Sequence, residues 1–350
     1  MSNNHTTVGV IGLGLIGGSM ALDLKRRGFA ARTLGVEADP VAAEAARTIG
    51  LVDEVTDLDT CIRRADIIVL AVPVGTAVKL VTYVLDKFQQ GAGQFQEGAG
   101  VFPEASATSL VSEISSVQEG AAVFSTASAI SLAGEKTALP DGPKGPDGQK
   151  TPDWNNKIVI DVCSTKEQIC RAVQYHPCRA QFVSTHPMAG TEYSGPWAAQ
   201  PGLFDGRACI FCNSEESSPK AVKEIEEMYA VLNMRPLYMR ADQHDVHTAY
   251  VSHISHVTSF ALALTVLDKE KDEKHIFDLA SGGFSSTVRL AKSNADMWVP
   301  ILTQNHDNVL QVMDTYLEKM QAFREAVASY DEARIRELIT EANRIKKIIR

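Results

Sequence analysis

The segment Val8-Gly9-Val10-Ile11-Gly12-Leu13-Gly14-Leu15-Ile16-Gly17 decides the fold of this chain. An apolar run typical of a strand leads into three glycines, and a stretch with helical spacing, Ser19 to Arg27, follows. Glycines in this context hold the pyrophosphate of a dinucleotide against the N-terminus of the helix. The first glycine allows the tight turn, the second lets the backbone approach the pyrophosphate, and the third lets the helix pack closely on the strand.

The second apolar run, Thr33 to Val36, ends at an acidic residue. Glu37 lies twenty residues after Gly17, where a carboxylate accepts a hydrogen bond from the adenosine ribose. A carboxylate there also repels a 2′-phosphate, so the sequence favours NAD over NADP. Asp39 is a competing candidate two residues further on, and the sequence alone does not rank the two.

The alternation of apolar runs and helical stretches continues through the first half of the chain. Strands are predicted at 52–56, 66–73, 157–162 and 181–185, and helices at 40–49, 74–88 and 165–174. This pattern predicts a buried parallel sheet with crossover helices, whose ligands bind at the carboxyl ends of the strands. The predicted cofactor contacts are Gly12, Leu13, Gly14, Leu15, Ile16, Gly17, Glu37, Val72 and Pro73.

Size and composition limit the classes of protein to consider. A chain of 350 residues is long enough for two domains, and a net charge of −9 argues against a nucleic-acid surface. No apolar run approaches the ~20 residues that a membrane-spanning helix requires. The polar start of the chain shows no signal peptide, so we expect a cytoplasmic protein.

The six cysteines are scattered along the chain. Cys209-Ile210-Phe211-Cys212 has a C-x-x-C spacing, but it lies in an apolar, strand-like run in which residues three apart point to opposite faces. Because no second pair is near, buried thiols are a better interpretation than zinc or redox chemistry.

The chain changes character twice. Residues 89–156 are rich in Gly, Ala, Ser and Thr and predict a surface insertion, and from 241 onward the strand patterns cease. Residues 246–267 form a long apolar segment that needs burial on all sides, which a second copy of the chain would supply. We therefore predict an α/β Rossmann-type NAD-binding domain at 1–240, followed by an all-α dimerisation and substrate domain at 241–350, in a homodimer.

His186 ends a predicted strand at the ligand-binding edge of the sheet. An alcohol that is oxidised by NAD loses a hydride and a proton, so the reaction requires a base beside the nicotinamide. Histidine suits this task because its unperturbed pKa is about 6.5. We therefore predict that His186 is a catalytic residue.

Further candidates lie in the second half. His253 and His256 share a helical face and could bind a metal, but no acidic third ligand stands at helical spacing, so we predict hydrogen bonding and no metal. Arg289 follows the glycine turn Gly282-Gly283 and could hold a carboxylate through two parallel hydrogen bonds. A surface arginine on a helix is the alternative.

Six segments together resemble the prephenate dehydrogenase family in order and spacing, over nearly the whole chain except the insertion. They are Gly12 to Gly17, Asp161-Val162-Cys163-Ser164-Thr165-Lys166, His186 to Glu192, His244-Asp245, Ser252 to His256, and Gly282 to Ala291 followed by Trp298. The resemblance implies an NAD-dependent oxidative decarboxylation of prephenate to 4-hydroxyphenylpyruvate, in tyrosine biosynthesis.

The resemblance also implies roles for single residues. His186 would interact with the ring hydroxyl of the substrate, Ser164 would help to orient it, and Arg289 would meet a carboxylate. Because the substrate has two carboxylates, Lys166 is a candidate for a second cation near the site. The substrate pocket would contain Glu192, Ser252, His253, His256, Arg289 and Trp298. Ser255 stands where the family commonly has proline, and Ser285-Ser286 replace a more charged pair, which leaves the substrate preference open.

Three alternatives stay open. An arogenate dehydrogenase performs the same reaction on a substrate with an amino acid side chain, whose ammonium group Glu192 could meet. Another NAD-linked dehydrogenase or imine reductase would not act on cyclohexadienyl acids. A non-catalytic, NAD-dependent regulator would use the pocket only for binding.

Overall fold

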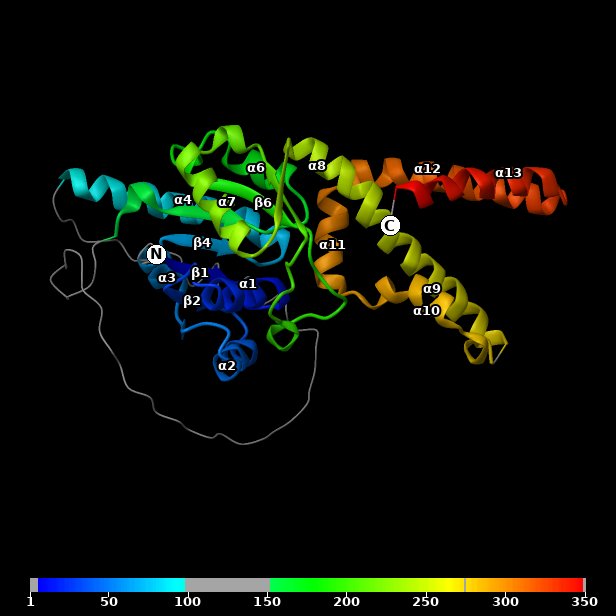
Figure 1. The fold of residues 1–350 in the computed structure, drawn as a ribbon, viewed down its shortest axis with the longest axis horizontal. Helices are drawn as coiled ribbons and strands as arrows, with labels where there is room; N and C mark the ends of the chain where they lie inside the picture. The colour runs from blue at the N-terminus through cyan, green and yellow to red at the C-terminus, as the bar shows by residue number, and fades with distance from the viewer. Residues whose placement is uncertain (1–5, 98–151, 274, 349–350) are drawn as a thin grey trace. The chain divides into compact units, whose positions relative to one another are not determined.

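The computed structural model describes residues 6–97, 152–273 and 275–348 (Figure 1). Contacts within the chain divide it into two compact units. Unit 1 comprises the chain up to His244 together with Ser293–Ile301, and unit 2 comprises Asp245–Lys292 and the chain from Leu302. The division into domains at 1–240 and 241–350 stays a prediction.

Unit 1 is built on an eight-stranded sheet with the order β3-β2-β1-β4-β5-β6-β7-β8. Its strands are β1 (Thr7–Ile11), β2 (Arg32–Val36), β3 (Glu54–Val55), β4 (Ile67–Leu70), β5 (Ile158–Asp161), β6 (Phe182–Pro187), β7 (Ala208–Cys212) and β8 (Arg235–Met239). The predicted parallel sheet is confirmed from β3 across to β6. β7 runs antiparallel to β6 and β8 pairs parallel with β7, so the sheet is mixed at this edge, which the sequence did not indicate.

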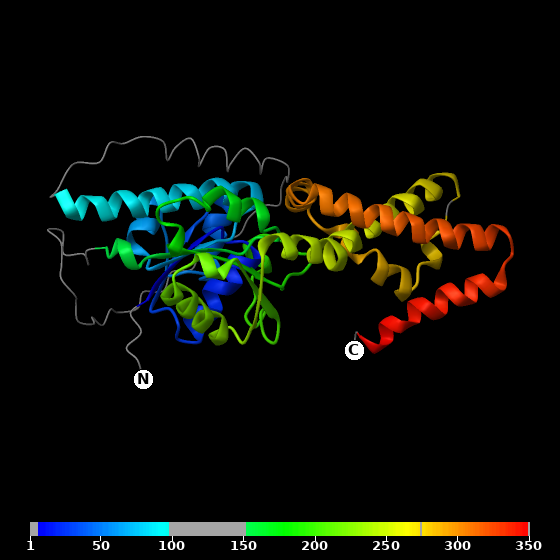
Figure 2. The same cartoon turned by 90° about the horizontal axis from the view of Figure 1, so that it is seen from above.

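Helices cover both faces of the sheet. They are α1 (Leu15–Arg26), α2 (Pro40–Ile49), α3 (Leu58–Arg64), α4 (Val74–Glu97), α6 (Glu167–Val173) and α7 (Pro219–Val231). Met20 and Leu24 of α1 share one apolar core with Ile225 and Met228 of α7, and α4 and α6 lie together on the opposite face (Figure 2). The crossover helices predicted from the sequence are therefore present, although α1 begins four residues earlier than expected, at Leu15.

The insertion predicted at 89–156 begins too early. Residues 89–97 continue α4 as a helix, since Gln and Ala in this stretch favour helix and no proline interrupts it. Trp154, in the short 3-10 helix η1 (Trp154–Asn156), packs against Gly91 so closely that a Cβ there would overlap its ring. The Phe88 and Trp154 ring centroids are 6.4 Å apart. The remainder of the predicted insertion, 98–151, lies outside the described residues.

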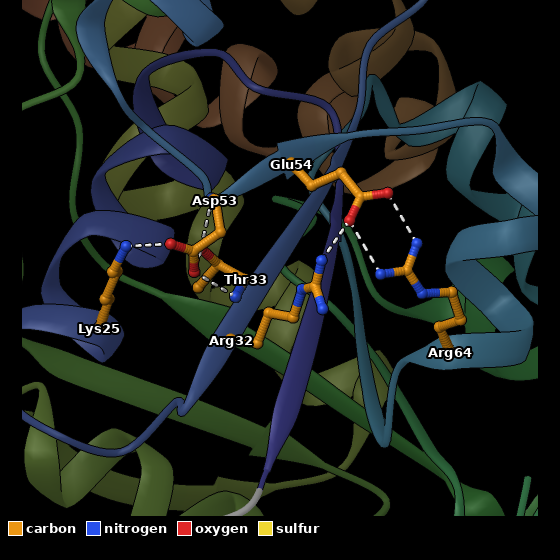
Figure 3. A network of polar contacts seen from close by, with 6 residues as sticks. All are labelled: Lys25, Arg32, Thr33, Asp53, Glu54 and Arg64. Atoms are coloured by element: carbon orange, nitrogen blue, oxygen red, sulfur yellow. Dashed lines mark hydrogen bonds and ion pairs between the residues drawn. The ribbon is translucent and has the colours of Figure 1, made fainter. Parts of the chain in front are cut away.

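Ion pairs fix the short strand β3 in place (Figure 3). Asp53 pairs with Lys25 of α1 and accepts hydrogen bonds from the Thr33 backbone N–H at 2.9 Å and its hydroxyl at 3.0 Å. Glu54 accepts two hydrogen bonds from Arg64 of α3, at 2.7 and 2.8 Å, and one from Arg32 at 2.6 Å. Side chains thus supply the stability that a two-residue strand cannot obtain from its backbone pairing alone.

Unit 2 is helical, as predicted. It contains α9 (Ile254–Asp272), α10 (Gly282–Thr287), α12 (His306–Ala328) and α13 (Glu332–Ala342), with the 3-10 turns η6 (Phe277–Leu279), η7 (Arg289–Lys292) and η8 (Asn343–Lys347). α8 (Ala241–Thr248) leads into α9 through a π-helix, η5 (Ala249–His253), and α11 (Ala295–Gln304) begins in unit 1.

The apolar segment 246–267 is helical but largely uncovered within one chain. The side chains of Val251, Leu264 and Leu267 are 68%, 62% and 50% exposed. Among the described residues, one helix, 241–271, is long and apolar enough to span a membrane by length and composition. The expectation that no run approaches that length was therefore wrong, because the many Ala, Val, Ile and Leu residues of the segment outweigh its Ser, Thr and His in the mean hydropathy.

Candidate active site

The glycine-rich loop between β1 and α1 has the geometry that its sequence predicts. Gly12 has a φ of +94°, and a Cβ on it would collide with the Ala71 carbonyl oxygen at the end of β4. A Cβ on Gly17 would overlap the Gly12 carbonyl oxygen. A Cβ on Gly14, by contrast, would meet no atom within 4 Å. The loop therefore leaves open space at Gly14, next to the uncapped N-terminus of α1, which fits a bound pyrophosphate.

The structure separates the two acidic candidates that follow β2. Glu37 faces the glycine-rich loop and accepts a hydrogen bond from the Leu13 backbone N–H at 2.9 Å. Asp39 is the N-cap of α2 and accepts a hydrogen bond from the Val41 backbone N–H at 2.8 Å. Because Asp39 already stabilises a helix end, Glu37 is the better candidate for the ribose.

The carboxyl ends of β5 and β6 are joined by the buried carboxylate of Asp161. Its Oδ1 accepts hydrogen bonds from the Ser184 hydroxyl at 3.0 Å and the Thr185 backbone N–H at 3.3 Å. Its Oδ2 accepts a hydrogen bond from the Cys163 backbone N–H at 3.0 Å. One side chain thereby fixes the backbone immediately before Ser164 and immediately before His186.

The ammonium of Lys166 neutralises this carboxylate. Lys166 is fully buried, pairs with Asp161 and donates to the Thr185 carbonyl oxygen at 2.6 Å. Burial alone would lower the pKa of Lys166, but the Asp161 charge outweighs burial and raises the pKa above its usual value. The expectation that Lys166 serves a substrate carboxylate is therefore corrected. This lysine is enclosed by the sheet and has a structural role.

His186 lies in β6 at the predicted edge of the sheet, half-buried, and contacts a second histidine. Its Nδ1 lies 2.8 Å from Nε2 of His244 in α8, with the two rings edge to face at a centroid distance of 5.0 Å. His244 is fully buried. The sequence offered no local signal for this pair, since 58 residues separate the two histidines. Only the packing of α8 brings them together.

The connection from β6 to β7 is anchored on α1. The Gln200 backbone N–H donates to Ser19 Oγ at 2.9 Å, and the Gly202 backbone N–H donates to Asp23 Oδ2 at 2.8 Å. Arg27 donates to both carboxylate oxygens of Asp205, at 2.8 and 3.0 Å. Three residues at successive helical turns of the predicted cofactor helix thus hold the segment that carries Glu192.

Two predicted substrate residues lie near each other in unit 2. His256, in α9, has a pKa lowered from its usual value, first by burial and also by the positive charge of Arg289. Arg289 is exposed at the start of η7, which packs on α9, and the Ser259 hydroxyl donates to the Thr287 carbonyl oxygen at 3.0 Å across this contact.

The remaining candidates occupy varied environments. Ser164, Glu192 and Ser252 are half-buried, His253 and Trp298 are buried, Val72 is half-buried and Pro73 is exposed. Cys209 and Cys212 are buried thiols in β7, as predicted, and burial raises the pKa of Cys209. Within the part of the chain that the structure describes, no three His, Cys, Asp or Glu side chains gather to hold a metal.

Sequence comparisons match most of the chain to a pair of domain families. "Prephenate dehydrogenase, nucleotide-binding domain" matches residues 20–93 and 154–237, and "Prephenate dehydrogenase, dimerization domain" matches residues 240–341. The prephenate dehydrogenase of Bacillus subtilis is 24% identical over 333 residues, which are 95% of this chain and 72% of that protein. The prephenate dehydrogenase of Lactococcus lactis is 24% identical over 97% of this chain and 76% of its own length.

Solved structures share the fold. Prephenate dehydrogenase from Aquifex aeolicus, in complex with hydroxyphenyl propionate and NAD+, matches with a TM-score of 0.72 at 22% identity, over 100% of both chains. Synechocystis arogenate dehydrogenase matches with a TM-score of 0.62 at 23% identity, over 98% of this chain and 99% of its own.

Proposed function

Since this chain belongs to the prephenate dehydrogenase family, we propose that it catalyses the NAD-dependent oxidative decarboxylation of prephenate to 4-hydroxyphenylpyruvate, a step of tyrosine biosynthesis. Its cofactor is NAD, which supplies the hydride acceptor when bound. The Aquifex aeolicus relative binds NAD+, and the open space at Gly14 beside the N-terminus of α1 suits the pyrophosphate of the same cofactor. Leu13, Leu15, Ile16, Val72 and Pro73 complete the proposed cofactor contacts.

One observation supports the reaction more than any other. The glycine-rich loop follows β1, Ser164 follows β5, and His186 lies at the end of β6, and all three strands run parallel in one sheet. Because the carboxyl ends of parallel strands meet at one edge, the cofactor loop and the candidate base face the same side of unit 1. This is the arrangement that hydride transfer from an alcohol requires.

We assign His186 the role of general base. Prephenate carries a ring hydroxyl, a ring carboxylate and a pyruvyl side chain. As one ring nitrogen of His186 takes the hydroxyl proton, the hydride leaves the same carbon and the ring carboxylate departs as carbon dioxide. The electron pair of the broken carbon–carbon bond enters the ring, which becomes aromatic. Ser164 orients the hydroxyl.

The two ring nitrogens of His186 would have different roles. Nδ1 faces Nε2 of His244, so a proton on Nδ1 leaves the lone pair on the Nε2 atom of His186 for the substrate. The carbonyl and carboxylate groups of prephenate require donors and cations, and we assign Arg289 to a carboxylate because a guanidinium binds it through two parallel bonds. Glu192, Ser252, His253, His256 and Trp298 are the other proposed substrate residues.

Arogenate is the alternative substrate. Glu192 is half-buried on the segment that follows His186, and a carboxylate there would attract the ammonium group of arogenate. The Synechocystis protein that shares the fold is an arogenate dehydrogenase, and a Zymomonas mobilis protein that is 27% identical over 175 residues is named cyclohexadienyl dehydrogenase. The same sheet edge would serve either substrate, because the bonds that change are identical.

Purified protein with NAD and each substrate in turn tests the proposal. We expect NADH, carbon dioxide and 4-hydroxyphenylpyruvate from prephenate in equal amounts. NADH from arogenate alone would reassign the side-chain pocket. No NADH from either, with NAD still bound, would contradict the enzyme assignment and favour the regulator.

We further propose a cytoplasmic homodimer formed through unit 2. The matching domain family is described as a dimerization domain, and α9 exposes Leu264 and Leu267. A second copy of the chain would cover this apolar helix, whose length and composition otherwise also suit a membrane span. Sedimentation of the wild-type protein should give a dimer, and Leu264→Glu should shift it toward monomer. A wild-type monomer, or a protein that sediments with membranes, would contradict this.

A further inference from the structure

His253 and His256, the second pair of histidines, carry their protons on different ring nitrogens. His256 Nδ1 lies 3.0 Å from the Ser252 carbonyl oxygen, which can only accept a hydrogen bond. His256 therefore carries a proton on Nδ1. His253 Nδ1 lies 3.1 Å from Nδ2 of Asn305, so the proton position of His253 depends on which way that amide is turned.

Three contacts settle the orientation of the Asn305 amide. Its Nδ2 donates to the Asp245 carbonyl oxygen at 2.7 Å, which excludes an oxygen at that position. Its Oδ1 accepts a hydrogen bond from Asn308 Nδ2 at 2.8 Å. The same Nδ2 faces His253, so His253 Nδ1 is the acceptor and carries no proton. In the neutral ring the proton of His253 then sits on Nε2.

The surroundings of His253 favour this neutral form. His253 and Asn305 are 1% and 3% exposed. Burial lowers the pKa of His253 to about 4, although the nearby Asp245 charge acts in the opposite direction and His256 adds to the lowering. His253 also closes the π-helix η5, an irregularity that often marks functional sites.

We propose that Asn305 is a positioning residue, which holds His253 with its proton on Nε2 so that His253 meets a substrate oxygen as a hydrogen-bond donor and takes no proton in the reaction. The role of His253 toward substrate rests on the proposed function, whereas the proton position rests on the contacts of Asn305. Nδ1 of His253 is engaged by Asn305 and Nε2 carries the proton, so this ring offers no lone pair to a metal, whatever the H-x-x-H spacing suggests.

Nuclear magnetic resonance of the full-length protein, labelled with nitrogen-15 in histidine, tests the proton position directly. Correlation of ring nitrogens with ring carbon-bound protons distinguishes the two neutral forms and the charged form. The His253 signal is identified by its loss in His253→Gln. We expect the Nε2-protonated form at neutral pH. A proton on Nδ1, a mixture or a charged ring would overturn the proposal.

Asn305→Asp tests the cause. An aspartate of the same shape accepts rather than donates, so the His253 proton should move from Nε2 to Nδ1. Loss of the His253 hydrogen bond should then raise the KM for prephenate about tenfold while the Kd of NAD stays unchanged. Asn343→Asp, the same change at an exposed site in unit 2, should alter neither.

A folded Asn305→Asp protein whose His253 keeps its proton on Nε2 would show that Asn305 is not responsible. Asn305→Ala, which removes the donor without adding a charge, serves if the aspartate variant does not fold, and its His253 should show a mixture of both neutral forms. An unmixed Nε2-protonated ring in Asn305→Ala would equally overturn the role of Asn305. The spectra are recorded without substrate, so they separate this proposal from the fate of the proposed reaction.

Discussion

The Nδ1 atom of His186 lies 2.8 Å from the Nε2 atom of His244 in α8, and the second ring is completely buried. A buried partner for one ring nitrogen fixes the orientation of a histidine, and a partner that accepts a hydrogen bond also fixes the position of its proton. His244 therefore orients the candidate base without needing to touch the substrate.

Removing the His244 ring should slow catalysis and leave cofactor binding intact. We expect His244→Leu to lower kcat with prephenate by about 10- to 100-fold, because His186 loses its preferred tautomer. His244→Gln, whose amide oxygen can accept from Nδ1, should recover part of the loss. His247→Leu changes an exposed histidine of the same helix and serves as the control. An unchanged kcat in His244→Leu would show that the contact has no part in the reaction.

Glu37 and Asp39 should separate cofactor affinity from helix stability. Glu37→Ala should weaken NAD binding by roughly 10-fold, the equivalent of about 1.4 kcal/mol, and reduce discrimination against NADP. Asp39→Ala should leave NAD affinity unchanged but lower the free energy of unfolding by about 1 kcal/mol, since it removes the N-cap of α2. Titration calorimetry and urea unfolding measure the two effects. The reverse pattern would make Asp39 the ribose ligand.

The buried pair of Lys166 and Asp161 should be a large contributor to stability. Lys166→Met leaves the Asp161 carboxylate buried without its cation, and we expect the free energy of unfolding to fall by about 3–5 kcal/mol. Lys25→Met breaks an exposed pair with Asp53 and should cost about 1 kcal/mol or less. Equal losses in the two variants, by urea denaturation, would argue against this difference.

Two glycines in α4 should respond oppositely to alanine. A Cβ at Gly91 would overlap the Trp154 ring, so Gly91→Ala should destabilise the protein by about 1–3 kcal/mol. A Cβ at Gly93 meets nothing within 4 Å, so Gly93→Ala should raise the free energy of unfolding by up to about 1 kcal/mol through helix propensity. If both substitutions stabilise the protein equally, the packing of η1 on α4 is not as described.

The sequence was informative where function depends on local pattern. The steric roles of Gly12 and Gly17 and the place of His186 at a strand end follow from spacing and periodicity, and the structure agrees with each. The partners of the histidines could not be predicted in this way. His244 contacts His186 across 58 residues and Asn305 contacts His253 across 52, so only tertiary packing brings them together.

Burial was the second property that the sequence did not predict correctly. The sequence suggested that Lys166 is a cation available to the substrate. In the structure it is enclosed between β5 and β6 with Asp161. The helix at 246–267 reads as buried on every side, yet one chain leaves Val251 and Leu264 exposed. In both cases burial depends on which elements pack together, and the residue pattern of a single element does not show this.

The most direct test compares NADH formation from prephenate by the wild-type protein and by His186→Asn, with the affinity for NAD measured on the same preparations. We expect turnover by the wild-type protein, a loss of about 100-fold or more in kcat for the variant, and equal NAD affinity in both. Turnover that survives the substitution would contradict the assignment of His186 as the base, and an inactive wild-type protein that binds NAD would contradict the proposed reaction itself.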